Sequence, residues 1–298
     1  MTVRRSLVGL IGGNIMKSLS PALHEDAFES FGLRGHYHLM DLDRLPGRRL
    51  ENLLEAVTCA GFDGVNVTFP CKQAVMPLLD EVSPEARQIG AVNTVTIAAD
   101  GRTAGYNTDR SGFARSFEEG LGRASMEGRT AVLVGAGGAG RAVAFALMDL
   151  GAAQLRIHDT DMPRAEALAA DLAHDFGAAR ARAVRDLEAA VAQSDGVVNA
   201  TPIGMLGIPG NPVPPAAWRP QHWAADVIYT PMETAFIQSA RAAGARVLTG
   251  GGMCVHQAAD AFRLFTGLVP DIARMHRTFA RALAARDAAL LGMRPVGR

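Results

Sequence analysis

The stretch TAVLVGAGGAGRAVAFALMDLG, residues 130–151, decides the fold of the second half of the chain. An apolar strand is followed by a glycine-rich turn and a helix, and Gly135, Gly137 and Gly140 have the G-x-G-x-x-G spacing. The spacing alone is a weak signal, and an ordinary turn is the alternative, but this strand–turn–helix context is the one that dinucleotide binding requires. We therefore predict a Rossmann domain whose glycine turn and helix N-terminus hold a pyrophosphate, through Gly135, Ala136, Gly137, Gly138, Ala139 and Gly140.

The next predicted strand ends in RIHDTD and places Asp159 about 20 residues after Gly140, where the fingerprint expects an acid for the ribose hydroxyls. A carboxylate there would repel a 2′-phosphate by about 4 kcal/mol per charge pair at about 4 Å, for an effective dielectric constant of about 20. We therefore predict NAD rather than NADP as the cofactor. In the alternative, Asp159 only caps the turn, and Asp161 or Arg164 recognises the cofactor.

Outward from this domain, the chain continues to alternate between strands and helices. Its 298 residues suggest two domains. In residues 1–110 we predict strands in SLVGLIG, HYHLMDL and GVNVTF, two further strands around the turn ADGR, and helices in PALHEDAFESFG and LENLLEAVTCAG. We expect Ser20 to be the N-cap of the first helix, with Pro21 in its first turn and Gly32 beyond its end. The fold class is therefore α/β in both halves.

Composition excludes several classes of partner. Lys+Arg and Asp+Glu both number 30, so the neutral chain has no excess of positive charge for nucleic acid. The cysteines, Cys59, Cys71 and Cys254, have no metal-ligand spacing, and we expect no metal site. No apolar run reaches the length of about 20 residues that spans a bilayer, and the apolar part of MTVRRSLVGLIGG is too short for a signal peptide. We expect a cytoplasmic protein that is a monomer or homodimer.

Polar residues gather at predicted strand ends in the first half. They occur in SLSP, NVTFPCK, GAVNT and GYNTD. Each has a plain structural interpretation, such as a helix cap, a turn residue or a surface lysine. Ligands collect at strand ends in open α/β sheets, however, so the clusters together predict a binding site. The histidines His24 and His256 lie on predicted helices, and we interpret them as core or rim residues rather than bases.

Over nearly its whole length the chain resembles the shikimate/quinate dehydrogenase family. The motifs that carry the resemblance occur in the expected order and approximate spacing: SLSPALH, NVTFPCK, GAVNTV, GYNTD, GAGGAGRA, NATPIGM, DVIY and GGGMCVHQAADAF. The resemblance implies a substrate-binding domain at residues 1–110, completed by C-terminal helices at 253–298. It also implies a Rossmann domain at 111–252 and a cleft between the two domains.

The resemblance further implies roles for individual residues. Lys72 and Asp109 would form the catalytic pair. Substrate, a small anionic polyhydroxy cyclohexene or cyclohexane carboxylate, would be held by Ser18, Ser20, Thr68, Asn93, Tyr229 and Gln257. The nicotinamide side of the cofactor site would be lined by Thr201, Val227 and Gly250. The fingerprint and its alternative add Asp159 and Arg164 as further cofactor-binding candidates.

Several alternatives remain open at this stage. The HDTD stretch differs from the NRT-like stretch of many NADP-using members and resembles the NAD-using branch, which often accepts quinate. Ser20, in contrast, is typical of shikimate specialists. An amino analogue of either substrate, or a non-catalytic role as a regulator that binds shikimate and NAD, is an alternative function. Within catalysis, either neutral Lys72 accepts the hydroxyl proton, or Lys72 stays cationic and Asp109 relays the proton.

Overall fold

The computed structural model describes residues 5–44 and 47–292, which form two compact units. The first unit ends at Thr108 and resumes at Ala258, and the second runs from Asp109 to Gln257. The predicted boundaries, after residue 110 and before residue 253, fall a few residues from these positions. Residues 1–4, which begin the segment compared with a signal peptide, lie outside the described residues. None of the described helices combines the length and apolar character needed to cross a membrane.

The described residues of the first unit include a six-stranded mixed sheet in the order β2-β1-β3-β5-β6-β4. β1 is parallel to β2 and β3, whereas β5 is antiparallel to β3 and β6. The carboxyl ends of β1, β3 and β6 therefore lie at the same edge as the amino end of β5. The strands are β1 (Arg5–Gly12), β2 (Arg34–Asp41), β3 (Gly64–Val67), β4 (Glu81–Val82), β5 (Thr94–Ile97) and β6 (Thr103–Tyr106).

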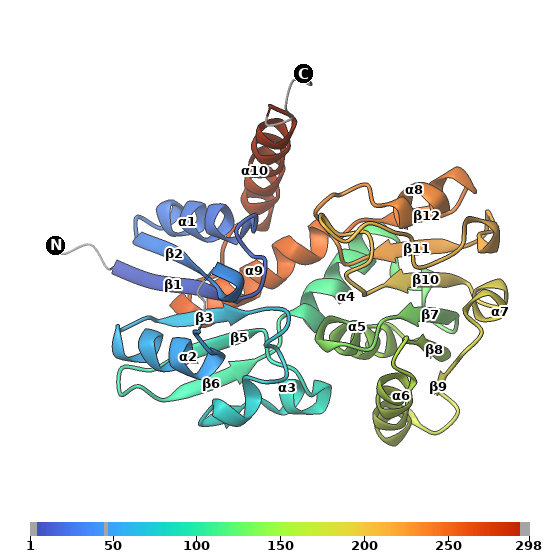
Figure 1. Cartoon of the computed structure of the whole chain (residues 1–298), viewed down its shortest axis with the longest axis horizontal. Helices are drawn as coiled ribbons and strands as arrows, with labels where there is room; N and C mark the ends of the chain where they lie inside the picture. Colours follow the sequence, from blue (N-terminus) through green and yellow to red (C-terminus); the bar gives the residue numbers. More distant parts are fainter. Residues whose placement is uncertain (1–4, 45–46, 293–298) are drawn as a thin grey trace. The chain divides into compact units, whose positions relative to one another are not determined.

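Helices cover both faces of this sheet (Figure 1). Val8 of β1 shares one apolar core with Phe28 of α1 and Phe262 of α9, while Val65 of β3 shares the opposite core with Leu54 of α2. The part of α9 from Ala258 onward and the described part of α10 belong to the first unit. The helices are α1 (Ser20–Ser30), η1 (Leu42–Arg44), α2 (Leu50–Cys59), η2 (Met76–Leu78), α3 (Pro84–Ile89), α9 (Gly251–Thr266) and α10 (Ile272–Gly292).

The predicted cap of α1 is wrong. Leu19 occupies the N-cap position, and no side chain caps the helix. The hydroxyl of Ser18 donates to the hydroxyl of Ser20 at 3.1 Å and accepts from the Ser20 amide at 3.2 Å. The helix thus begins at Ser20, one residue earlier than predicted, and its first amide donates to the Ser18 hydroxyl. Gly32 does lie beyond the helix end, with φ +66°.

The described residues of the second unit include a six-stranded parallel sheet in the order β12-β11-β10-β7-β8-β9. The strand order reverses between β7 and β10, and this switch point is where open α/β sheets bind ligands. The strands are β7 (Thr130–Val134), β8 (Gln154–His158), β9 (Ala181–Ala183), β10 (Gly196–Asn199), β11 (Trp223–Asp226) and β12 (Arg246–Leu248).

Helices flank this sheet as well, which confirms the predicted Rossmann architecture (Figure 1). Val132 of β7 shares an apolar core with Val191 of α7 and Phe236 of α8. The helix after the glycine turn, α5, follows β7 directly and is almost wholly buried. The helices are α4 (Asp109–Gly120), η3 (Arg123–Ser125), α5 (Gly138–Asp149), α6 (Met162–Phe176), α7 (Leu187–Ala192), η4 (Pro215–Ala217) and α8 (Ala235–Ala242).

Candidate functional site

Strand ends gather the predicted substrate residues of the first unit at one edge of its sheet. Ser18 and Ser20 follow β1, and Thr68 and Lys72 follow β3. Asn93 precedes β5, and because β5 is antiparallel to β3, its amino end meets the carboxyl end of β3. The strand order therefore brings together three segments that are far apart in the sequence.

Close backbone contacts join these segments. A Cβ on Gly12 would lie 2.3 Å from Cγ2 of Thr68, so only glycine fits where β1 passes the end of β3. The carbonyl oxygen of Lys72 accepts a hydrogen bond from the amide of Val92 at 2.8 Å. The lysine at the end of NVTFPCK is thus anchored by its backbone to the segment that carries Asn93.

Asn93 is held by a buried network. It is 3% exposed, and its Oδ1 accepts from the Thr108 amide at 2.8 Å while its Nδ2 donates to the Thr108 hydroxyl at 3.0 Å. Behind it, Asn66 donates to the Asn93 carbonyl at 3.2 Å and accepts from the Tyr37 hydroxyl at 2.9 Å. No role was assigned to Asn66 from the sequence. Its signal was a polar residue within the otherwise apolar strand GVNV.

The glycine turn of the second unit leaves open space at its second glycine. Gly135 has φ +102°, and a Cβ there would lie 2.8 Å from the Ala200 carbonyl oxygen. A Cβ on Gly140 would lie 1.9 Å from the Gly135 carbonyl oxygen, whereas a Cβ on Gly137 would meet no described atom within 4 Å. Packing within the protein therefore requires the first and third glycines. The second leaves space beside the N-terminus of α5, where the fingerprint expects pyrophosphate.

The carboxylate of Asp159 is fixed next to this turn. Its Oδ2 accepts from the Ala136 amide at 2.7 Å, and its Oδ1 accepts from the Asp161 amide at 2.9 Å. A carboxylate has about four acceptor positions, so these two bonds leave capacity for ribose hydroxyls. Arg164, the other cofactor-binding candidate, forms a largely exposed ion pair with Asp161 at 3.0 Å. Its role toward the cofactor stays a prediction.

A buried polar network connects the ends of β10 and β11. Asn199 accepts from the Thr201 hydroxyl at 2.7 Å and donates to Oδ1 of Asp226 at 3.2 Å. Oδ2 of Asp226 accepts from the Thr234 hydroxyl at 2.7 Å, and Oδ1 accepts from the Ile228 amide at 3.0 Å. Burial raises the pKa of Asp226 to about 6, and the three hydrogen bonds oppose that rise. The network fixes Thr201, which was predicted beside the nicotinamide.

The remaining predicted nicotinamide residues lie at the neighbouring strand ends. A Cβ on Gly250 would lie 2.5 Å from the Val227 carbonyl oxygen, so glycine is required there. The Val227 amide donates to the Asn199 carbonyl at 3.1 Å. Thr201, Val227 and Gly250 therefore border the carboxyl ends of three adjacent strands, β10 to β12. Tyr229, two positions after Val227, is partly exposed.

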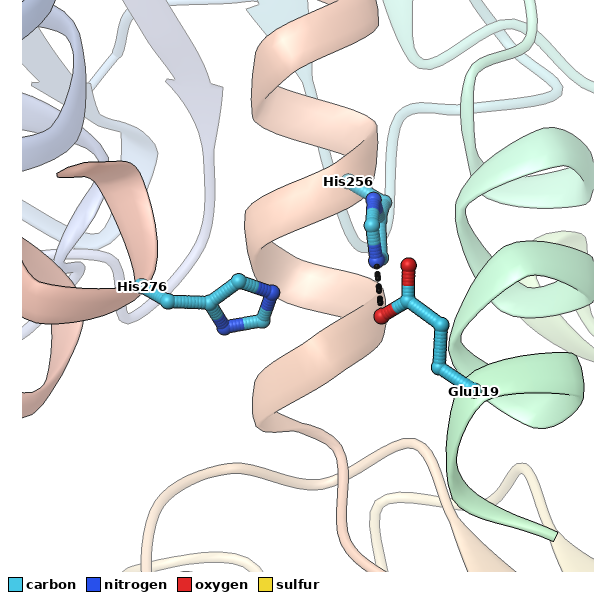
Figure 2. Close-up of side chains that lie close together, drawn as sticks. All are labelled: Glu119, His256 and His276. Atoms are coloured by element: carbon cyan, nitrogen blue, oxygen red, sulfur yellow. Dashed lines mark hydrogen bonds and ion pairs between the residues drawn. The ribbon is translucent and has the colours of Figure 1, made fainter. Parts of the chain in front are cut away.

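Helices α4 and α9 pack tightly within the second unit. A Cβ on Gly112 of α4 would lie 2.8 Å from the Gln257 amide nitrogen of α9. Further along α4, the carboxylate of Glu119 contacts Nε2 of buried His256 at 2.9 Å (Figure 2). Asp109 begins α4 one turn before Gly112 and is itself buried. The two helices therefore bring Gln257 against the turn that starts with Asp109.

The predicted catalytic pair is divided between the units, with Lys72 in the first and Asp109 in the second. The pairing therefore stays a prediction, as does the cleft. The substrate residues are divided in the same way. Ser18, Ser20, Thr68 and Asn93 belong to the first unit, and Tyr229 and Gln257 to the second.

Comparison with known families gives three matches along the chain. The family model of the shikimate dehydrogenase substrate binding domain matches residues 10–95. The shikimate/quinate 5-dehydrogenase model matches residues 118–205, and the shikimate 5′-dehydrogenase C-terminal domain model matches residues 250–278. The matches fall in both units and include α9, within which the chain passes from the second unit to the first.

Individual proteins are similar over most of the chain. Quinate/shikimate dehydrogenase (NAD(+)) of Corynebacterium efficiens is 51% identical over 277 residues, 92% of this chain and 97% of that protein. Shikimate dehydrogenase (NADP(+)) of Streptomyces avermitilis is 50% identical over 279 residues, 92% of this chain and 95% of that protein. The solved structure of quinate dehydrogenase from Corynebacterium glutamicum in complex with NAD has a TM-score of 0.85 and 47% identity, and covers 93% of this chain and 100% of that one. Since equally similar relatives are named for different cofactors, overall identity does not decide the cofactor.

Proposed function

The chain belongs to the shikimate/quinate dehydrogenase family, and from this premise we propose that it is an NAD-dependent enzyme that interconverts shikimate and 3-dehydroshikimate. Quinate, with 3-dehydroquinate as product, is the second substrate to test. The proposed preference for NAD rests on one observation: the Asp159 carboxylate accepts a hydrogen bond from the amide of Ala136, the residue before the open position at Gly137.

Residues of the second unit fit NAD. The backbone of 135–140 would hold the pyrophosphate, and Asp159 would accept hydrogen bonds from the ribose hydroxyls. Thr201, Val227 and Gly250 would border the nicotinamide, with Thr201 fixed by the Asn199 network. When bound, NAD supplies the acceptor for the hydride. A 2′-phosphate would bring negative charge to the Asp159 carboxylate, which favours NAD over NADP.

Residues of the first unit suit an anionic polyhydroxy ring. The hydroxyls of Ser18 and Ser20, already 3.1 Å apart, would donate to the substrate carboxylate. Thr68 and Asn93 follow or precede strands at the same sheet edge and would hold ring hydroxyls. Tyr229 and Gln257 of the second unit would complete the substrate contacts.

The proton chemistry rests on Lys72 and Asp109. When the ring carbon loses its hydride, the hydroxyl on that carbon must lose its proton. In one scheme neutral Lys72 accepts this proton. In the other, Lys72 remains an ammonium group that stabilises the developing alkoxide, and Asp109 accepts the proton. Both schemes require the amine of Lys72 at the reacting hydroxyl.

Steady-state kinetics with a matrix of substrates test the proposal. Shikimate, quinate and an amino analogue are each assayed with NAD and with NADP. We expect reduction of NAD by shikimate, with kcat/KM at least about tenfold above that for NADP. A tenfold ratio needs about 1.4 kcal/mol, less than half of the repulsion of about 4 kcal/mol at an effective dielectric constant of about 20. Equal kcat/KM for both cofactors would refute the NAD preference. Binding of NAD without turnover of any substrate would favour the regulator instead.

A pair of matched variants tests the cofactor assignment. Asp159→Asn should reduce the NAD/NADP ratio of kcat/KM by about tenfold or more, because it removes the charge that opposes a 2′-phosphate. Asp161→Asn removes the same charge two positions away. If Asp161→Asn moved the ratio and Asp159→Asn did not, the turn-capping interpretation of Asp159 would hold.

A further inference from the structure

We propose that Asp41 is a positioning residue for the substrate. Its buried carboxylate holds the loop of residues 13–19, so that Ser18 and Ser20 face the substrate carboxylate in a fixed arrangement. The inference rests on the proposed function and adds a residue that lies outside every motif of the family resemblance.

Asp41 accepts three backbone hydrogen bonds. It is the last residue of β2, next to the end of β1, and it is 5% exposed. Oδ1 accepts from the amides of Asn14 and Asp43, and Oδ2 accepts from the amide of Ile15, each at 3.1 Å. Both carboxylate oxygens thus bind the backbone, and two of the three bonds go to the loop after β1.

The loop after β1 contains a residue in the left-handed conformation. Asn14 has φ +53°, and it is the only non-glycine residue with positive φ in the described ranges. Asparagine adopts this left-handed conformation more readily than most side chains but less readily than glycine, so contacts on either side of Asn14 help to hold it. The bonds from Asp41 to Asn14 and Ile15 fall at this point of the loop.

Hydrogen bonds lead from Asp41 to the serines. Ile15, whose amide binds Asp41, accepts from the Ser18 amide through its carbonyl at 2.9 Å. The Ser18 hydroxyl in turn accepts from the Ser20 amide at 3.2 Å. The side chain of Ile15 is buried, so packing holds this residue in addition to its backbone hydrogen bonds. Asp41 therefore acts on the substrate through Ile15 and Ser18, without touching it.

The same loop is tied to the segment that carries the lysine. The Gly13 amide donates to the Phe69 carbonyl at 2.8 Å, three positions before Lys72. A loop held at Gly13, Asn14 and Ile15 sets the distance between the serines and the end of β3. Substrate anchored by its carboxylate would then present its ring to the lysine segment at a defined place.

The negative charge of Asp41 allows one substitution to distinguish a positioning role from an electrostatic one. A negative group close to the serines opposes an anionic substrate, so removal of the charge alone would lower KM. Loss of the loop restraint would raise KM. The direction of the KM change in Asp41→Asn therefore separates positioning from simple electrostatics.

Asp41→Asn keeps the shape of the side chain but replaces one acceptor oxygen by an NH2 group, so at least one amide loses its partner. We expect KM for shikimate to rise about tenfold, the effect of one hydrogen bond to a charged acceptor, with kcat within about twofold and KM for NAD unchanged. The control Asp43→Asn removes the same charge from an exposed side chain, and all constants should stay within about twofold. An unchanged or lowered KM for shikimate in Asp41→Asn would overturn the proposal.

Coupling to Ser18 tests the route of the effect. In a Ser18→Ala background, Asp41→Asn should raise KM less than about threefold, because residues in one network are not additive. A full additive increase would show that Asp41 acts elsewhere, and would also overturn the proposal.

Hydrogen exchange of the unmodified protein tests the loop without turnover. The amides of Asn14 and Ile15 should exchange at least about 100-fold more slowly than an unstructured chain, before any substrate is added. Exchange at the unstructured rate would overturn the proposal even if Asp41→Asn fails to fold. Absence of turnover by the unmodified protein and by Asp43→Asn would instead refute the proposed function, and the exchange result would still decide whether the loop of residues 13–19 is held in place.

Discussion

His24 should make the first unit sensitive to acid, and the substitution His24→Phe should remove that sensitivity. His24 of α1 is fully buried, with its ring stacked on Tyr37 at a centroid distance of 4.7 Å. The rings of Phe262 and Phe265 lie at 6.2 and 5.9 Å. Among the described residues neither ring nitrogen of His24 has a hydrogen-bond partner. Burial lowers the pKa of His24 from 6.5 to about 3.

The pKa shift sets both the sign and the size of the effect. The unfolded chain binds a proton at His24 below pH 6.5, whereas the folded chain stays neutral down to about pH 3. The free energy of unfolding therefore has its full value above pH 6.5 and falls as the pH drops from 6.5 towards about 3. From about pH 8 to about pH 5, the loss is about 2 kcal/mol of unfolding free energy.

Hydrogen exchange of β1 and β2 is a suitable assay because both tryptophans, Trp218 and Trp223, lie in the second unit and do not report on the first. Global opening energies of the strand amides, corrected for intrinsic exchange, are compared at the two pH values. The unmodified protein should lose about 2 kcal/mol more than His24→Phe. Phenylalanine fills the aromatic site without a titratable nitrogen.

A matched control separates this effect from general acid sensitivity. His38→Gln replaces an exposed histidine on β2 and should leave the pH dependence of the unmodified protein intact. If His24→Phe lost as much stability as the unmodified protein between the two pH values, His24 would have to be charged in the folded state. The burial argument would then be wrong.

Three further outcomes are expected. Lys72→Ala should lower kcat about 10²- to 10⁴-fold with little change in KM, and near-normal kcat would exclude both proton schemes. Gly137→Ala should raise KM for NAD without loss of stability, whereas Gly140→Ala should lower Tm. The reason is that a Cβ on Gly140 would lie 1.9 Å from the Gly135 carbonyl oxygen, while a Cβ on Gly137 would meet no described atom. Equal Tm values for the two variants would contradict this packing. Asp226 has a raised pKa, so the free energy of unfolding of the second unit should fall by about 2 kcal/mol as the pH rises from 3.8 to about 6. Asp226→Asn should abolish that slope in urea titrations followed by tryptophan fluorescence, and an unchanged slope would assign it to other groups.

Several features of the fold could be predicted because they depend on local chemistry. The glycine turn was predictable because Gly135 and Gly140 serve backbone contacts that no other residue tolerates. The longer strands and helices followed from their apolar patterns. The short elements β4, β9, α3 and α7 were not predicted, since two to six residues carry too little periodicity. The cap of α1 was mispredicted because the helix begins at Ser20 itself, whose amide donates to the Ser18 hydroxyl.

The partners of buried polar side chains were harder to predict from the sequence. Asp41 and Asp226 each end a strand, and Asn199 ends another, so each offered a sequence signal: a polar residue closing an apolar run. Asp41 accepts hydrogen bonds from amides of the loop after the neighbouring strand, β1. Asp226 accepts from the Ile228 amide in its own loop and from the side chain of Asn199 at the end of the neighbouring strand, β10. The partners at the ends of β1 and β10 follow from strand order, which the local sequence does not show.

The sequence alone determined the order of elements, the dinucleotide turn with Asp159 after the following strand, and the polar residues available at strand ends. These depend on backbone conformation and hydrophobic periodicity within a few residues. Only the tertiary structure decided that Asp41 holds the loop of Ser18, that His24 is sealed among aromatic rings, and that Asn93 meets the end of β3. Each of these depends on the pairing of segments distant in the chain, and strand order and direction are fixed by the packing of the whole unit rather than by any local stretch.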